Sequence, residues 1–278
     1  MGLKAFLIND TEDVYHWGCN GTSSQIKKQL YEKDIEYVFS LPVNTIPVLP
    51  NVPDRIEDIG TREDFIEKFR PIANAMTVSD IIVVNGEGTI HDFSRGTKGI
   101  LFLIRDNWAK IPGNIIGHDY VCISGAVNYN VLRTDFIIAK IKEKYPQHKI
   151  VYLAGSKTEG IIKKEVGVIS HYLEKIPEML VFDAKTLNDW LAVIKHAAVL
   201  ISGRYHYTIA GACFGTPMIY FPSNTPKIEA IAYDNGLPAA VSTKDEYLRM
   251  MDSLDNINWS SQLESLCEKA ERNYHWEI

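Results

Sequence analysis

The sequence has few of the features that mark membrane-spanning, metal-binding or nucleic-acid-binding proteins. Its four cysteines are scattered over 278 residues, and no pair has the spacing of metal ligands. No apolar run approaches the roughly 20 residues that are needed to span a bilayer. The net charge of −6 and the pI near 5.8 argue against nucleic acid as the main partner, because domains that bind it are usually basic.

The amino terminus carries no recognisable targeting signal. The start MGLKAFLIND is typical of a first strand, not of a cationic region followed by a long apolar core. It also lacks the serine or threonine of a myristoylation site. We therefore expect a cytoplasmic protein. Peripheral contact with the inner face of the membrane stays open as an alternative, since the carboxy-terminal region is polar and helical.

What the sequence does contain is an alternation of strand and helix patterns. The strand-like runs cover residues 3–9, 35–41, 80–86, 120–126, 149–155, 178–184, 198–202 and 217–222. Helical patterns between them predict parallel sheets with right-handed crossovers, which is an α/β fold. Eight strands fit two Rossmann-like, doubly wound halves. We place the amino-terminal domain at 1–120 and the carboxy-terminal domain at 121–278.

Polar residues fill the loop after the first strand, NDTEDVYHWGCNGTSS (9–24). In open parallel sheets, ligands bind at the carboxyl ends of strands, so such loops are informative. We expect a helix over 22–34 with Thr22 or Ser23 as its cap. The candidate binding residues here are Asp10, His16 and Asn20. An ordinary polar loop with a capped helix is an equally good interpretation.

The loop after the third strand, NGEGTIHDFSRG (85–96), places Glu87 between two glycines, with His91 close behind. It is not a dinucleotide fingerprint, because a histidine stands where the third glycine belongs, and it is not a phosphate-binding P-loop. Glycines let the backbone approach a ligand closely. Glu87 is therefore a candidate acid/base or hydroxyl acceptor, and the competing interpretation is a tight turn with a solvated glutamate.

The stretch SGRYHYTIAGACFGTP (202–217) places cationic-capable side chains where a strand ends and a helix begins. Ser202 and Gly203 end the strand, and Arg204 and His206 follow. A helix dipole disfavours a cation at this end, so the pattern predicts a bound anion held by backbone N–H groups, Arg204 and His206.

Lys227 repeats this pattern at the start of the next expected helix, after Pro226. Two such helix ends from adjacent strands would converge on one anion-binding cleft. The competing interpretations are a surface arginine with a core histidine, and a solvated surface lysine.

SGRYHYTIAGACFGTPMI followed by PKIEAIAYDNGLP resembles the polysaccharide pyruvyl transferase family, and VNGEGTIHD is similar to its glycine-rich strand-end loop. The resemblance implies two Rossmann-like domains facing a cleft, as in GT-B glycosyltransferases. It also implies transfer of a pyruvyl group from phosphoenolpyruvate to sugar hydroxyls, which forms a ketal on a cell-surface glycan or its precursor, in exopolysaccharide or capsule biosynthesis. Arg204 and His206 match the family's functional arginine and histidine.

These observations together define the expected site. The catalytic candidates are His206, Arg204 and Glu87. The donor-binding candidates are Ser202, Gly203, Arg204 and Lys227. The acceptor-binding candidates are Asp10, His16, Asn20 and His91. We expect phosphoenolpyruvate as co-substrate without a further cofactor or metal, and a glycan or lipid-linked sugar as acceptor.

Two other functions fit the same pattern. A GT-B-type glycosyltransferase would place Arg204 and Lys227 on the phosphates of a nucleotide-activated sugar. A non-catalytic glycan-binding or scaffolding subunit would bind no phosphorylated donor at all.

Overall fold

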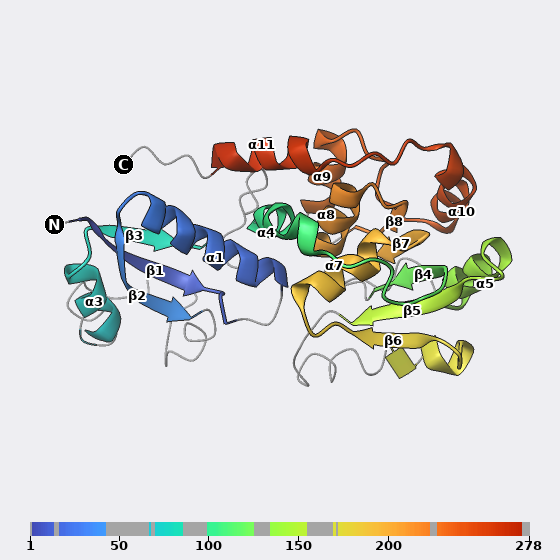
Figure 1. Cartoon of the computed structure of the whole chain (residues 1–278), viewed down its shortest axis with the longest axis horizontal. Coiled ribbons are helices and arrows are strands. Elements are labelled where there is room, and N and C mark those ends of the chain that lie inside the picture. Colours follow the sequence, from blue (N-terminus) through green and yellow to red (C-terminus); the bar gives the residue numbers. More distant parts are fainter. Residues whose placement is uncertain are drawn as a thin grey trace. The chain divides into compact units, whose positions relative to one another are not determined.

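The computed structural model describes residues 2–13, 17–42, 67, 70–85, 99–124, 134–154, 169–170, 172–222 and 227–273. The chain divides into two compact units (Figure 1). Unit 1 comprises Met1–Val14 and Cys19–Asp92, and unit 2 comprises Tyr15–Gly18 and Phe93–Ile278. Each unit contains a parallel sheet with helices packed against it, as the alternating pattern predicts.

Unit 1 is built on a sheet of three described strands in the order β2-β1-β3, all parallel. Its described elements are β1 (Lys4–Asp10), α1 (Trp17–Glu32), β2 (Glu36–Pro42), α3 (Arg70–Thr77) and β3 (Ile81–Val84). Phe6, Leu41 and Ala75 form the buried cluster between the sheet and α3. The chain order reverses at β1, which has β2 on one side and β3 on the other.

Helix α1 begins at Trp17, five residues before the expected start at residue 22. The predicted cap at Thr22 or Ser23 is therefore wrong, because both residues lie inside the helix and are buried. Ser23 does accept a backbone N–H, but from Thr11 in the strand-end loop at 2.7 Å. Its hydroxyl thus ties the helix to the loop.

Unit 2 contains a five-stranded parallel sheet in the order β6-β5-β4-β7-β8. Its strands are β4 (Tyr120–Ile123), β5 (Lys149–Ala154), β6 (Leu180–Asp183), β7 (Val199–Ser202) and β8 (Met218–Tyr220). The chain moves outward from β4 through β5 to β6, and then returns to add β7 and β8 on the other side. This is the Rossmann order, and its switch point lies between β4 and β7.

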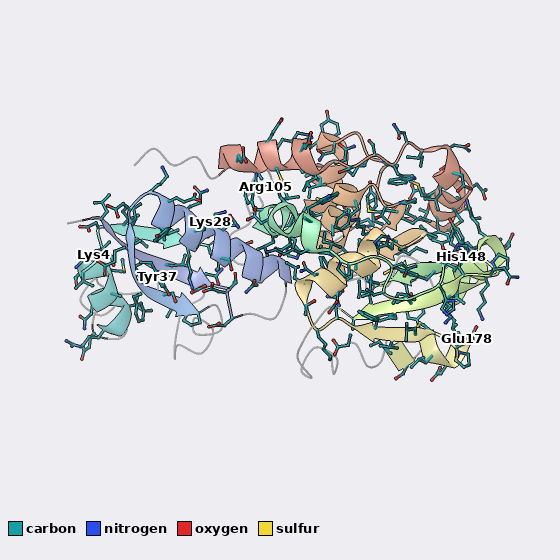
Figure 2. All side chains as sticks on the ribbon, viewed as in Figure 1. Lys4, Lys28, Tyr37, Arg105, His148 and Glu178 are labelled. Carbon is teal, nitrogen blue, oxygen red and sulfur yellow. The ribbon has the colours of Figure 1, made fainter. Side chains whose placement is uncertain are left out.

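The described helices of unit 2 are α4 (Gly99–Asn107), η3 (Trp108–Lys110), α5 (Thr134–Lys144), α7 (Leu187–Lys195), α8 (Tyr205–Phe214), α9 (Lys227–Asp234), α10 (Lys244–Ser253), η4 (Leu254–Asn256) and α11 (Leu263–Asn273). Arg105 of α4, labelled in Figure 2, reaches Glu271 of α11 at 2.7 Å. None of the described helices is long and apolar enough to cross a membrane.

Helix α4 precedes the division predicted after residue 120, yet it packs with α8 and α11 in unit 2. Packing therefore separates the units at Asp92/Phe93, whereas the second sheet begins at Tyr120. That 1–120 and 121–278 fold as separate domains stays a prediction.

Helix α8 packs against β7 and β8 of the second sheet, and its middle turns are built from buried residues that include Ala210, Gly211 and Ala212. A Cβ at Gly211 would come 2.3 Å from the sulfur of Met218, so any larger residue would have to displace the Met218 side chain of β8. Gly215 ends the helix in the left-handed conformation, with φ of +69°, as expected from the sequence. Close packing along α8 fixes where its amino end meets the carboxyl edge of the sheet.

Candidate functional site

The carboxyl ends of β4 and β7 meet at the switch point of the second sheet, and two serines join them there. The backbone N–H of Ser124 donates to the carbonyl of Ile201 at 3.0 Å. The hydroxyls of Ser124 and Ser202 lie 2.5 Å apart, and Ser202 Oγ also accepts the backbone N–H of Arg204 at 3.0 Å. In open α/β sheets this edge is where ligands bind.

Arg204 is the residue that caps the amino end of α8. Its backbone is extended, with φ −101° and ψ 125°, and its carbonyl accepts both the N–H and the hydroxyl of Thr208 at 3.1 and 3.2 Å. The first N–H groups of a helix have no partner within the helix, and the amino end of a helix is the end at which its dipole favours an anion. Arg204 and His206 are both half-buried.

Lys227 at the start of α9 lies close to the first turn of α8. Its Nζ is 5.8 Å from the centroid of the Tyr205 ring, and the Tyr205 and His206 rings pack edge to face at 5.2 Å. The structure thus brings together Arg204, His206 and Lys227, which the sequence analysis placed on two separate helix starts. At the opposite end of α9, Lys269 Nζ binds the carbonyl of Asp234 at 2.5 Å, which is where a helix dipole favours a cation.

A second polar junction lies at the switch point of the first sheet and centres on Asn85, which directly follows β3. The side-chain amide of Asn85 donates to Thr11 Oγ1 at 3.0 Å and to Ser23 Oγ at 3.1 Å. The backbone carbonyl of Asn85 accepts a hydrogen bond from the side-chain amide of Asn9 at 2.5 Å, and Asn9 has a left-handed φ of 63°. All four residues are buried.

Neither Asn85 nor Ser124 was among the expected site residues. One signal was available for both, since each is a polar residue that directly follows an apolar strand. The partners of these residues, however, come from distant parts of the chain. Only the sheet order shows which strand ends are neighbours.

Two acceptor-binding candidates, Asp10 at the end of β1 and Asn20 in α1, make contacts around the loop that joins these two elements. Lys27 Nζ lies 2.8 Å from Asp10 Oδ2 and also pairs with Glu12, while the amide of Asn20 donates to the carbonyl of Glu12 at 2.5 Å. Burial raises the pKa of Asp10, but hydrogen bonds from Lys27, the Glu12 N–H, Ser40 and Ser23 outweigh it, so that the pKa is lowered overall. A carboxylate with a lowered pKa is a weaker base.

The remaining candidates, His16, Glu87 and His91, lie outside the described residues. Within the described part of the chain, no group of three histidine, cysteine, aspartate or glutamate side chains is placed to hold a metal ion.

Residues 102–225 match the model of the polysaccharide pyruvyl transferase family. This confirms the resemblance found in SGRYHYTIAGACFGTP. The matched segment begins in α4 and contains the whole second sheet, including Ser124, Ser202 and Arg204. The pyruvyl transferase match therefore coincides with the switch point at which the cationic side chains gather. No curated protein matches the sequence.

Solved structures share the fold across nearly the whole chain. MnaA of S. aureus, solved with UDP, has a TM-score of 0.57 at 10% identity and covers 99% of this chain and 93% of its own. UDP-GlcNAc 2-epimerase of Methanocaldococcus jannaschii has a TM-score of 0.54 at 13% identity, covering 94% of each chain. UDP-GlcNAc 2-epimerase of Neisseria meningitidis, bound to UDP-GlcNAc, has a TM-score of 0.51 at 9% identity. The match covers 98% of this chain and 100% of the epimerase chain. At such identities the likeness shows the fold alone, and the predicted GT-B-like α/β class is confirmed.

Proposed function

We propose that this protein transfers a pyruvyl group from phosphoenolpyruvate to two hydroxyls of a sugar, forming a cyclic ketal on a cell-surface glycan or its precursor. The observation that carries this proposal is the pyruvyl transferase match over the segment in which Arg204 and His206 lie at the switch point. Lys227, just beyond the matched segment, adds a third cationic-capable group at the same place.

Phosphoenolpyruvate carries a phosphate and a carboxylate, and both suit the first turn of α8. The guanidinium of Arg204 holds one of these groups through two parallel hydrogen bonds, and Lys227 adds a second positive charge. Ser202 and Gly203 shape the corner from which α8 starts. The N–H groups of the helix start complete the anion site.

The reaction needs one proton at the methylene carbon of phosphoenolpyruvate, which builds positive charge at C2. A sugar hydroxyl attacks C2 and loses its proton, phosphate leaves with the C–O bond electrons, and a second hydroxyl closes the ketal. The two hydroxyl protons balance the new methyl group and the released phosphate, so that no metal or other cofactor is required. We assign protonation of the departing phosphate to His206.

Acceptor activation is assigned to Glu87, with His16, Asn20 and His91 as acceptor-binding residues. Asp10 is the weaker choice of base, because its pairing with Lys27 stabilises the ionised form. A lipid-linked acceptor would bring this cytoplasmic enzyme to the inner face of the membrane.

The proposal is tested by a phosphate-release assay with phosphoenolpyruvate and a glycan acceptor. Arg204→Ala and His206→Ala should each reduce turnover by about 100-fold or more, as removal of a group that stabilises transition-state charge does. Arg249→Ala, which removes an exposed arginine of α10, is the matched control and should retain full activity. Unchanged turnover in both site variants would contradict the proposal.

A thermal-shift screen separates the proposal from its rivals. Phosphoenolpyruvate should raise the melting temperature of the wild-type protein but not of Arg204→Ala. Stabilisation by UDP or CMP instead would favour a glycosyltransferase. No stabilisation by any of these phosphorylated compounds would favour a non-catalytic glycan-binding subunit.

A further inference from the structure

Ser202 joins three parts of unit 2: the end of β4, the start of α8 and the end of β8. It contacts Ser124 Oγ at 2.5 Å and accepts the N–H of Arg204 at 3.0 Å. The Ser202 carbonyl accepts the N–H of Phe221, just after β8, at 3.0 Å. Ser202 and Ser124 are only 1% and 6% exposed, so these hydrogen bonds are shielded from competition with water.

A count of protons shows what Ser124 contributes. A serine hydroxyl donates one hydrogen bond and accepts up to two. Ser202 already accepts from Arg204, and either serine of the pair can donate to the other. If Ser124 donates, Ser202 keeps its own proton for an incoming anion. If Ser202 donates, its only proton is used within the protein.

We propose that Ser124 is a positioning residue for the donor: it donates to Ser202 when an anion is bound, and so fixes both the Ser202 hydroxyl and the backbone of Arg204. A bound anion only accepts hydrogen bonds. The Ser202 proton is left to point toward that anion only when Ser124 donates to Ser202. The inference rests on the proposed function, since it assumes that the anion at the start of α8 is phosphoenolpyruvate. Ser124 lies within the segment that matches the pyruvyl transferase family, directly after β4, the strand next to β7.

The test compares Ser124→Ala with Ser124→Thr by titration calorimetry with phosphoenolpyruvate. Ser124→Ala should raise the Kd about tenfold, the effect of losing one hydrogen bond that supports a charged ligand. Ser124→Thr keeps the hydroxyl and should restore the Kd to within about threefold of wild type. In turnover assays, the KM for phosphoenolpyruvate should rise more than kcat falls.

Thr216→Val provides a matched control for a merely structural role. Thr216 is buried in the same unit, and its hydroxyl donates to the carbonyl of Ile194 at 3.1 Å, near the amino end of β8. Its loss should lower the melting temperature without changing the Kd.

Three outcomes would overturn the inference, and they are distinguishable. If wild type binds phosphoenolpyruvate and Ser124→Ala binds it equally well, Ser124 does not position the donor, while the proposed function stands. If Thr216→Val weakens binding as much as Ser124→Ala does, the effect is a general loosening of the fold. If wild type binds no phosphoenolpyruvate, the proposed function fails and the inference fails with it.

Discussion

The two sheets of this protein carry the same kind of junction at their switch points, yet the charged side chains around the two junctions differ. Each has a pair of hydroxyls that joins neighbouring parts of the chain, Thr11 with Ser23 at 3.1 Å in unit 1 and Ser124 with Ser202 at 2.5 Å in unit 2. In both units a polar residue directly after a strand makes the contact. The shared architecture explains this likeness, because parallel strands end side by side at the switch point.

The difference lies in the charged groups around each junction. In unit 1, Lys27 of α1 pairs with Asp10 at the end of β1 and with Glu12 just after it, so that these opposite charges offset one another. In unit 2, Arg204 and Lys227 stand at helix amino ends, where the dipole already favours an anion. The same fold element thus carries paired opposite charges in unit 1 and cationic-capable side chains at helix amino ends in unit 2, where we propose an anion site.

The largest effect on this comparison is expected from Asn85→Ala. Removing the amide breaks the bonds to Thr11 and Ser23 and leaves buried hydroxyls without that partner. We expect a loss of about 3 kcal/mol in the free energy of unfolding of unit 1. Hydrogen exchange of β1 and β3 measures it. Asn74→Ala, at an exposed position of α3, is the control. Lost turnover with unchanged exchange would make the junction a binding site rather than a joint.

A smaller effect is expected from Lys27→Met, which leaves the Asp10 carboxylate without its cation. The free energy of unfolding of unit 1 should fall by about 2 kcal/mol at neutral pH, the usual cost of losing a buried charge-assisted hydrogen bond. The binding of phosphoenolpyruvate should not change. Weaker donor binding in Lys27→Met would contradict the division of roles between the units.

The ionisation of Asp10 gives a further test of its structural role in unit 1. The pKa of Asp10 is lower in the folded state than its ordinary value of about 3.9. The ionised carboxylate therefore stabilises the fold at pH values above that ordinary pKa. This stabilisation is lost as the pH falls through the folded-state pKa. The stability difference between wild type and Asp10→Asn should be constant from about pH 5 to 7 and should shrink below about pH 4. Denaturation of both proteins over this pH range checks the direction of the Asp10 pKa shift. A stability difference that grows in acid would show that this direction is wrong.

The smallest effect is expected from Lys227→Met. A single positive charge near the donor phosphate should change the Kd for phosphoenolpyruvate by about threefold to tenfold, and the effect should decline with added salt. Lys244→Met is the matched control, because Lys244 also starts a helix and also lies over an aromatic ring, that of Phe136 at 5.3 Å. An equal effect from both lysines would mean that Lys227 acts only through the long-range field.

Local signals in the sequence were sufficient for some elements. Helix α8 begins at Tyr205, at the strand-to-helix junction expected within SGRYH. The start of α1 was misplaced because polar residues from Asn20 to Ser23 resemble a loop in sequence. In the structure their side chains contact the loop after β1 and the end of β3, which no local pattern records.

The sequence alone determined the α/β class and the strand ends on which to look for a ligand, and it predicted the anion-binding character of SGRYH. Periodicity, glycine positions and helix-end charge are local properties, and a linear sequence carries them directly. Tertiary structure alone decided that β4 lies beside β7, that α4 packs with unit 2, and that Lys27 neutralises Asp10. These contacts join residues far apart in the chain, and they depend on the order in which the strands assemble and on the burial that follows.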